Sequence, residues 1–312
     1  MRTFVTSAML LLSSFSFLEA DFIPAISVFS DSQEVGKAAA QKIADVIIKK
    51  QQEGQTPIVI GFATGNTPIP TYAAFKKLVR DTHLDLSDVI TFNLDEYIGL
   101  PTSHSQSYHS FMFSYLFDDL VASPTNPHGI KRENIHIPKG ATSNEEDLSQ
   151  EELTALAGQF PNRQGTALSL EEQFWIAQQR ANAYEALIEK LGPIDLQILG
   201  VGRNGHIGFA EPGTSFESTT MVAKLTENTR NINSSFFDGN VNEVPEFAIT
   251  MGIRTILNAK EILLLATGSS KATIIDKVLK KPISSDVPCT ALKLHEKTFF
   301  FLDEDAALIY KK

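Results

Sequence analysis

The sequence predicts an α/β fold with a single doubly wound, mostly parallel sheet and helices on both of its faces. Two observations carry this prediction. Short apolar runs, rich in β-branched or aromatic residues and bounded by Gly, Asp or Thr, recur along the chain. Longer segments with the apolar spacing of helices lie between these runs, so strands and helices alternate.

The predicted strands cover residues 26–29, 58–62, 89–92, 196–199, 262–266 and 298–302. The first predicted helix follows Asp31, where Glu34 three residues later is typical of a capping box, and it extends to residue 50. The other predicted helices cover residues 68–80, 105–117, 170–191 and 270–280. In such a sheet, ligands bind at the carboxyl ends of the strands, so the residues just after each strand are the candidates for function.

One domain is predicted, over residues 26–312, because no repeat or convincing linker divides them. Residues 141–168 are polar and acidic, which is typical of a surface excursion. Residues 1–25 form an N-terminal extension, in which Arg2 precedes an apolar run at residues 8–18. This run resembles a short signal peptide and is too short to span a membrane.

Composition and charge exclude several classes of function. The chain has 27 Lys and Arg against 37 Asp and Glu, a formal net charge of −10, so it lacks the basic surface that nucleic acids or anionic membranes require. Cys289 is the only cysteine, which excludes an intrachain disulfide. None of the seven histidines forms an HxxxH pair, and no metal site is expected.

Two segments are predicted to bind an anion. The first follows the strand at 58–62 and contains Thr64, Gly65, Asn66 and Thr67, with Thr67 expected to cap a helix that begins at residue 68. An ordinary capped turn would have the same sequence. The second follows the strand at 262–266.

In that second segment, Lys271 stands at the start of a predicted helix. Its charge opposes the helix dipole there, which a bound anion would explain. A solvated surface lysine is the alternative interpretation.

Adjacent carboxylates follow the strand at 89–92. One of the pair, Asp95 and Glu96, could act as a general base if burial brings its pKa close to the working pH. The alternative is that Asp95 only caps or turns the chain.

The most informative segment is the glycine-rich loop at 200–213. It contains a literal GxGxxG, but Pro212 follows where a dinucleotide-binding motif requires a long helix, so a dinucleotide is not expected. The glycines, Gly208 among them, are instead expected to give a small ligand room beside the backbone. His206 and Glu211 share this loop, and an imidazole near a carboxylate is a typical acid/base pair.

Residues 89–110 and 200–218 resemble the glucosamine-6-phosphate deaminase family, also called glucosamine-6-phosphate isomerases. Residues 233–242, 248–257 and 268–272 support the resemblance, which extends from residue 26 to the C-terminus. It implies a Rossmann-like fold of the sugar-phosphate isomerase type. It also implies conversion of glucosamine 6-phosphate and water to fructose 6-phosphate and ammonia in amino-sugar catabolism, without a cofactor, by an enzyme classed as a hydrolase of a cyclic amino sugar phosphate.

The resemblance also implies a role for each candidate residue. His206 would move a proton at the ring oxygen, with Glu211 and Asn204 orienting it, and Asp95 would be the enolisation base. Substrate-binding residues would be Thr64, Gly65, Asn66, Thr67, Gly208 and Lys271.

Two departures from the family pattern affect the expected site. Asn204 stands where one branch of the family has aspartate, so it can orient His206 but cannot help to stabilise a positive charge on it. Ser235 stands where the family usually has an arginine that binds the substrate phosphate, a contact of about 1.5–3 kcal/mol. Arg230 or Lys224 could replace that arginine.

Regulation is also expected to differ. Met221 and Ala223 occupy positions where the allosteric members carry basic residues, and the longer C-terminal tail of those members is missing. We therefore expect no activation by N-acetylglucosamine 6-phosphate. The connection over residues 140–180 is longer than is usual in the family.

Two other functions compete with the deaminase. A 6-phosphogluconolactonase-like hydrolase shares the fold, but Glu211 and the sequence at 95–97 argue against it. A catalytically silent sugar-phosphate sensor would explain Ser235, but the residues before 26 are too few and too apolar for a helix-turn-helix. Because a phosphorylated amino sugar is a cytoplasmic metabolite, we expect a cytoplasmic protein, although the signal-like N-terminus leaves export open.

Overall fold

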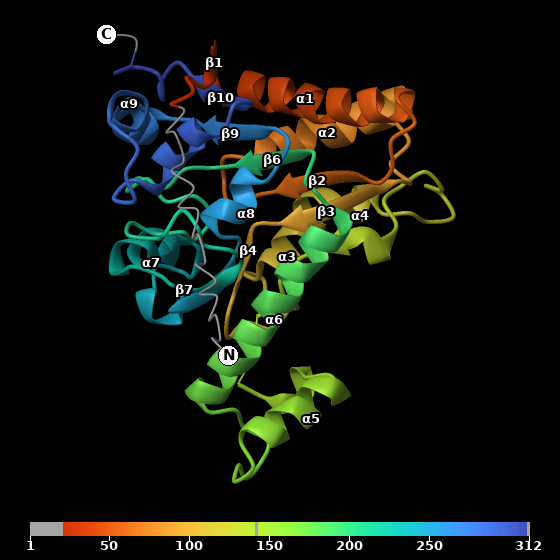
Figure 1. The fold of residues 1–312 in the computed structure, drawn as a ribbon. Helices are drawn as coiled ribbons and strands as arrows, with labels where there is room; N and C mark the ends of the chain where they lie inside the picture. The colour runs from red at the N-terminus through yellow and green to blue at the C-terminus, as the bar shows by residue number, and fades with distance from the viewer. Residues whose placement is uncertain (1–20, 141–142, 311–312) are drawn as a thin grey trace, which may run out of the picture.

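The computed structural model describes residues 21–140 and 143–310, and a parallel sheet runs through the middle of them (Figure 1). Within these residues the sheet has seven strands, every pair of neighbours parallel. In spatial order they are β1 (Ala25–Phe29), β10 (Thr298–Asp303), β9 (Ile262–Ala266), β6 (Leu196–Leu199), β2 (Ile58–Phe62), β3 (Val89–Asn93) and β5 (Ile135–His136). The predicted parallel α/β fold is confirmed. The signal-like segment lies outside the described residues.

Helices cover both faces of this sheet, because successive strand residues point to opposite sides. Ile58, Ile60 and Phe62 pack against α1, α2 and α3, whereas Val59 packs on the opposite face with α6, α8 and α9. The helices are α1 (Ser32–Gln52), α2 (Ile69–Thr82), α3 (Tyr108–Met112), α4 (Asp118–Leu120), α5 (Gln150–Gln159), α6 (Leu170–Leu191), α7 (Glu227–Asn233), α8 (Ile253–Leu257) and α9 (Ala272–Lys280). The chain within the described ranges has no helix that is both long and apolar enough to cross a membrane.

The order of the strands reverses between β2 and β6. After β2 the chain builds outward through β3 and β5, then returns to the other side of β2 and builds through β6, β9 and β10. The segments that follow β2 and β6 therefore leave neighbouring strands in opposite directions. This reversal opens a crevice at the carboxyl ends of the strands, which is where doubly wound sheets bind ligands.

A second, smaller sheet corrects the prediction of a single sheet. Among the described residues it has three antiparallel strands, in the order β4 (Asp95–Tyr97), β8 (Phe247–Thr250) and β7 (Met221–Lys224). These strands are three or four residues long. β4 begins with two carboxylates, and the apolar runs of β7 and β8 are only three residues long, which is too short to predict a strand. Pairing with β8 places Asp95 opposite Thr250 and fixes its orientation.

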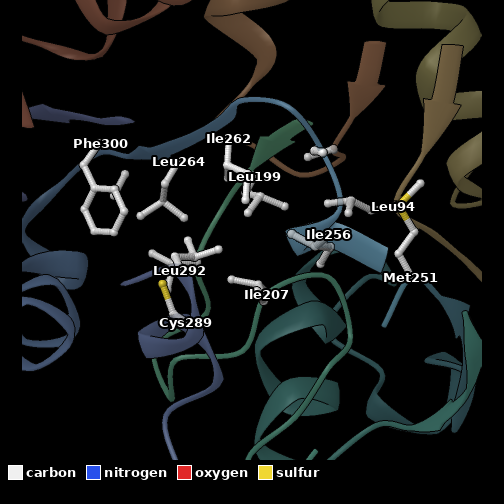
Figure 2. Close-up of a cluster of buried hydrophobic side chains, with 14 of the residues drawn as sticks. Leu94, Leu199, Ile207, Met251, Ile256, Ile262, Leu264, Cys289, Leu292 and Phe300 are labelled. Carbon is white, nitrogen blue, oxygen red and sulfur yellow. The ribbon is translucent and has the colours of Figure 1, made fainter. Parts of the chain in front are cut away.

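The main core reaches directly beneath the loops that carry the candidate site. Leu94, Ile207 and Met251 are buried in the same cluster as strand residues such as Leu199 and Leu264 (Figure 2). The N–H of Met251 donates to the carbonyl of Leu94 over 2.7 Å. Since Leu94 precedes Asp95 and Ile207 follows His206, burial of these apolar side chains anchors their polar neighbours.

Residues 143–168 contain structure that the expected polar excursion did not include. Helix α5 begins with a reciprocal capping box between Ser149 and Glu152, and its buried Leu156 packs in a small cluster with residues of α6. Arg180 of α6 makes two hydrogen bonds with the Glu152 carboxylate, of 2.6 and 3.1 Å. In Figure 1, α5 and the start of α6 extend away from the large sheet. The division into an extension and one domain stays a prediction.

The first turn of α2 differs from the prediction. Thr67 does not cap this helix, because the N–H of Ile69 donates to the carbonyl of Asn66 and already draws Pro68 into a helical conformation. The prediction of a Thr67 cap is therefore wrong. The predicted helix at 105–117 is also later and more irregular than expected: Ser107 caps α3, and a π-helical turn, Phe113–Phe117, follows it.

Candidate functional site

A cavity of about 430 Å³ lies at the carboxyl ends of the large sheet. It is bounded by the segments that follow four neighbouring strands, β3, β2, β6 and β9. Eight of the ten candidate residues line it: Thr64, Gly65, Asn66, Thr67, Asp95, His206, Gly208 and Lys271. The other two, Asn204 and Glu211, contact His206 from behind. Segments that are more than 200 residues apart thus meet in one place.

Asp95 presents a buried carboxylate to this cavity. Its side chain is 5% exposed, and Oδ1 has no hydrogen-bond partner among the described residues. Burial, together with the charge of the adjacent Glu96, raises the pKa of Asp95 well above its usual range. An unpaired, weakly acidic carboxylate is well suited to take up a proton.

Glu96 has a different role, because backbone N–H groups donate hydrogen bonds to its carboxylate. It accepts hydrogen bonds from the N–H groups of Tyr97, Tyr108 and His109, at 2.8, 2.8 and 2.9 Å, and so binds the first turn of α3. Burial raises the pKa of Glu96 to about 7, although these N–H groups act in the opposite direction. Of the two adjacent carboxylates, only Asp95 faces the cavity.

The change Glu96→Gln is expected to lower the free energy of unfolding by about 1–3 kcal/mol. The amide keeps one acceptor oxygen, but its NH₂ group would face a backbone N–H that the carboxylate now satisfies. Urea unfolding at pH 8 measures the loss. Glu217→Gln, at a largely exposed side chain, is the control and should be neutral. Equal stability of the two variants would contradict this account of Glu96.

His206 is held by the two candidate residues behind it. Its Nδ1 lies 3.4 Å from Oε2 of Glu211, and its backbone N–H donates to Oδ1 of Asn204. The Asn204 amide donates to Oε2 of Glu211 over 2.7 Å, and the hydroxyl of Thr229 donates to the other carboxylate oxygen. The imidazole, which also lines the cavity, faces Glu211 through Nδ1 at ion-pair distance without a hydrogen bond between them, and Nε2 is left for a ligand.

Glu211 is a charged partner for this imidazole. Burial alone would raise the pKa of Glu211, but the His206 ring and the hydrogen bonds from Thr229 and Asn204 hold it at about 2. A carboxylate that stays ionised stabilises a positive charge on the neighbouring ring.

Two glycines allow the loop after β6 to approach these groups. A Cβ on Gly202 would lie 2.4 Å from the His206 ring, so the backbone packs directly on the imidazole. Gly208 has a φ of +56°, and a Cβ there would lie 2.8 Å from the Thr250 hydroxyl and 3.6 Å from Oδ2 of Asp95. No helix follows this loop before β7, in agreement with the rejection of a dinucleotide motif.

The two predicted anion-binding segments lie on the same cavity. Thr67, which the helix does not use as a cap, faces the cavity with Thr64 and the backbone of residues 65–66. Lys271 precedes α9, and its Nζ donates to the carbonyl of Val201 over 2.6 Å. Burial and the charge of Arg203 lower the pKa of Lys271. Both segments therefore border the same cavity.

Ser235, which the resemblance places at the position of a phosphate-binding arginine, does not line the cavity. Ser235 is exposed and donates its hydroxyl to the carbonyl of Ile232. Neither residue considered as its substitute lines the cavity: Arg230 donates to the carbonyls of Val241 and Val244, and Lys224 lies over the ring of Phe247.

Several lining residues were missed from the sequence. Arg203, Tyr108 and Phe209 all line the cavity, and the Tyr108 ring stacks on that of Phe209. Arg203 could have been found, because it lies in the loop that directly follows β6. Tyr108 does not directly follow a strand of the large sheet. Examining the residues just after each strand therefore could not identify it. No group of three His, Cys, Asp or Glu side chains in the described part of the chain could hold a metal ion.

Comparisons with known sequences identify relatives of the chain. A family profile described as "Glucosamine-6-phosphate isomerases/6-phosphogluconolactonase" matches residues 30–300. A curated glucosamine-6-phosphate deaminase of Thermoanaerobacter sp. (strain X514) is 42% identical over 275 residues, which cover 88% of this chain and 90% of that protein. Another, from Bacillus pumilus (strain SAFR-032), is 39% identical over 278 residues, with coverage of 89% and 96%.

Solved structures give the same fold. A monomeric glucosamine-6-phosphate deaminase superposes with a TM-score of 0.74 at 36% identity, covering 91% of this chain and 99% of that chain. The 6-phosphogluconolactonase of Trypanosoma brucei has a TM-score of 0.66 at 21% identity, with coverage of 92% and 98%, and shows the fold alone. From the profile match and these relatives, the chain belongs to the glucosamine-6-phosphate isomerase/6-phosphogluconolactonase family.

Proposed function

We propose that this protein is a glucosamine-6-phosphate deaminase, which converts glucosamine 6-phosphate and water to fructose 6-phosphate and ammonia. The observation that carries the proposal is the pairing, in one cavity, of a buried unpaired carboxylate, Asp95, with an oriented imidazole, His206. The relatives at 36–42% identity are named for this activity. An isomerisation needs both groups, since protons move at the ring oxygen and at carbon.

Ring opening comes first in this mechanism. His206 takes the proton of the C1 hydroxyl and delivers a proton to the ring oxygen, so the bond between C1 and the ring oxygen breaks and the open-chain aldehyde forms. A positive imidazole is stabilised by Glu211, whose pKa of about 2 keeps it ionised throughout the neutral range. Asn204 holds the Glu211 carboxylate from the side.

Isomerisation and deamination follow. Asp95 takes the proton from C2 as O1 gains a proton from water, which gives an enolamine. Asp95 then returns its proton to C1 as the nitrogen releases one to water. The resulting C2 imine adds water and releases ammonia, so the atoms balance as fructose 6-phosphate and ammonia. The raised pKa of Asp95 favours this use, because the carboxylate accepts a proton more readily than an ordinary aspartate.

The phosphate end of the substrate is assigned to the two anion-binding segments. Thr64, Thr67 and the backbone of Gly65 and Asn66 offer hydroxyl and N–H donors, and Lys271 offers a charge. Gly208 leaves room for the sugar beside Asp95. This assignment needs no cofactor.

The sequence analysis expected an enzyme classed as a hydrolase. The comparisons do not support this classification, because the relatives are named as deaminases and isomerases. The resemblance to lactonases is one of fold, at 15–21% identity. A cytoplasmic location remains our proposal, on the ground that a phosphorylated amino sugar is an intracellular metabolite.

Ammonia release is the test of this function. The purified protein is incubated with glucosamine 6-phosphate, and ammonia and fructose 6-phosphate are measured in parallel. Both products should appear in equal amounts. Binding of the sugar phosphate without ammonia would favour a silent sensor, and hydrolysis of 6-phosphogluconolactone without ammonia release would favour the lactonase.

A further inference from the structure

Two basic side chains lie at the loop after β6 and face the cavity. Among the described residues that line it, Arg203 and Lys271 are the only Lys or Arg. They come from segments 68 positions apart, yet Nζ of Lys271 donates to the carbonyl of Val201, two residues before Arg203. Burial lowers the pKa of Lys271, and the charge of Arg203 lowers it further, as expected for two cations close together.

Neither cation is neutralised by the protein. In the described ranges, no carboxylate lies within 4 Å of Arg203 or Lys271, whereas Arg163 and Arg180 each contact two. The chain as a whole has a net charge of −10, yet these two cations border the same cavity. Two like charges at one cavity repel each other, and a bound anion would relieve that repulsion.

Backbone hydrogen bonds fix the position of the Arg203 main chain. The N–H of Gly202 donates to the carbonyl of His206 over 2.9 Å, and the N–H of Gly205 donates to the carbonyl of Gly202 over 3.0 Å. These bonds close a tight turn around residues 202–206. Arg203 therefore stands on the same rigid turn that positions His206, and its exposed guanidinium reaches the cavity from that turn.

We propose that Arg203 binds the substrate phosphate together with Lys271, in place of the arginine that is missing at Ser235. The inference rests on the proposed function for the identity of the substrate, and on the cavity for the location. A guanidinium can donate two parallel hydrogen bonds to a phosphate, which a single ammonium cannot. Arg230 and Lys224 cannot bind the phosphate in this way, because neither lines the cavity.

Steady-state kinetics of Arg203→Ala, Arg203→Lys and the wild type test this proposal. Arg203→Ala should raise KM for glucosamine 6-phosphate by about tenfold to a hundredfold, with kcat within about twofold, because a ground-state phosphate contact is lost. The KM of Arg203→Lys should lie between those of Arg203→Ala and the wild type, since lysine keeps the charge but not the two parallel N–H donors of the guanidinium. Arg80→Ala removes the same charge from the exposed last turn of α2, outside the cavity, and should match the wild type.

Binding of inorganic phosphate, measured by calorimetry, gives a readout without turnover. Arg203→Ala should weaken it by a factor similar to the rise in KM. If Arg203→Ala keeps both the wild-type KM and the wild-type phosphate affinity, the inference is wrong while the deaminase proposal stands. If no variant releases ammonia but phosphate binding still depends on Arg203, the deaminase proposal fails and the phosphate site stands.

Discussion

Replacing Asp95 with Asn is expected to lower kcat for ammonia release by about 10³- to 10⁴-fold. The amide has nearly the same shape but cannot take the proton from C2. Exchange of that proton with solvent should be lost together with ammonia release, whereas KM should change little, since the phosphate contacts remain. Exchange is followed by NMR in deuterium oxide, and ammonia by a coupled assay.

The fold of the Asp95→Asn variant should be intact, because Oδ1 of Asp95 has no partner among the described residues to lose. The urea midpoint is the control, and it should stay at or above that of the wild type. This result would contrast with Glu96→Gln, whose carboxylate is bound by three N–H groups.

The pH profile of the wild type gives a second check on Asp95. Only the deprotonated carboxylate can accept the C2 proton, and burial raises its pKa. On the acid side, kcat/KM should therefore increase with pH through a midpoint above the ordinary range of aspartate, about 3.9. Undiminished C2 exchange in Asp95→Asn would remove this residue from the mechanism.

Replacing His206 with Gln is expected to lower kcat/KM for glucosamine 6-phosphate by about 10²-fold or more. The closed sugar ring would lose the group that protonates its oxygen. Glutamine keeps a polar side chain beside Glu211 and Gly202, so the loop need not rearrange. Ammonia release over a range of substrate concentrations measures the loss.

An acyclic amino-polyol phosphate separates ring opening from binding. It has no ring to open, so the wild type and His206→Gln should bind it with equal affinity in a competition or calorimetric assay. A large loss of affinity would assign His206 to binding rather than to proton transfer. Wild-type turnover in His206→Gln would remove it from the reaction altogether.

The sequence alone located most of the fold. The apolar runs at 58–62, 196–199 and 262–266 coincide with β2, β6 and β9, and the predicted helix at 170–191 coincides with α6. Buried parallel strands are apolar on both faces, so they are visible as continuous runs. Ligands of such sheets lie beyond the carboxyl ends of the strands, which is why reading those positions led to residues that line one cavity.

Short antiparallel strands were not visible in this way. β4, β7 and β8 have three or four residues each, and their pairing partners are 23 or more positions away. Helix α5 was missed although Ser149 and Glu152 form a capping box, because its helical stretch is largely polar and carries one buried residue.

The choice between Asp95 and Glu96 was decided by tertiary structure. Successive residues of an extended chain point to opposite sides, and only the pairing of β4 with β8 and the position of α3 turn Asp95 to the cavity and Glu96 to the backbone N–H groups. Tertiary contacts also decided the spatial order of the strands and the approach of Arg203 to Lys271. They decided as well that the hydroxyl of Thr67 does not cap α2. Local sequence determines which segments become strands and what chemistry follows them, but contacts between distant segments determine which side chains meet, because those contacts form only when the sheet is assembled.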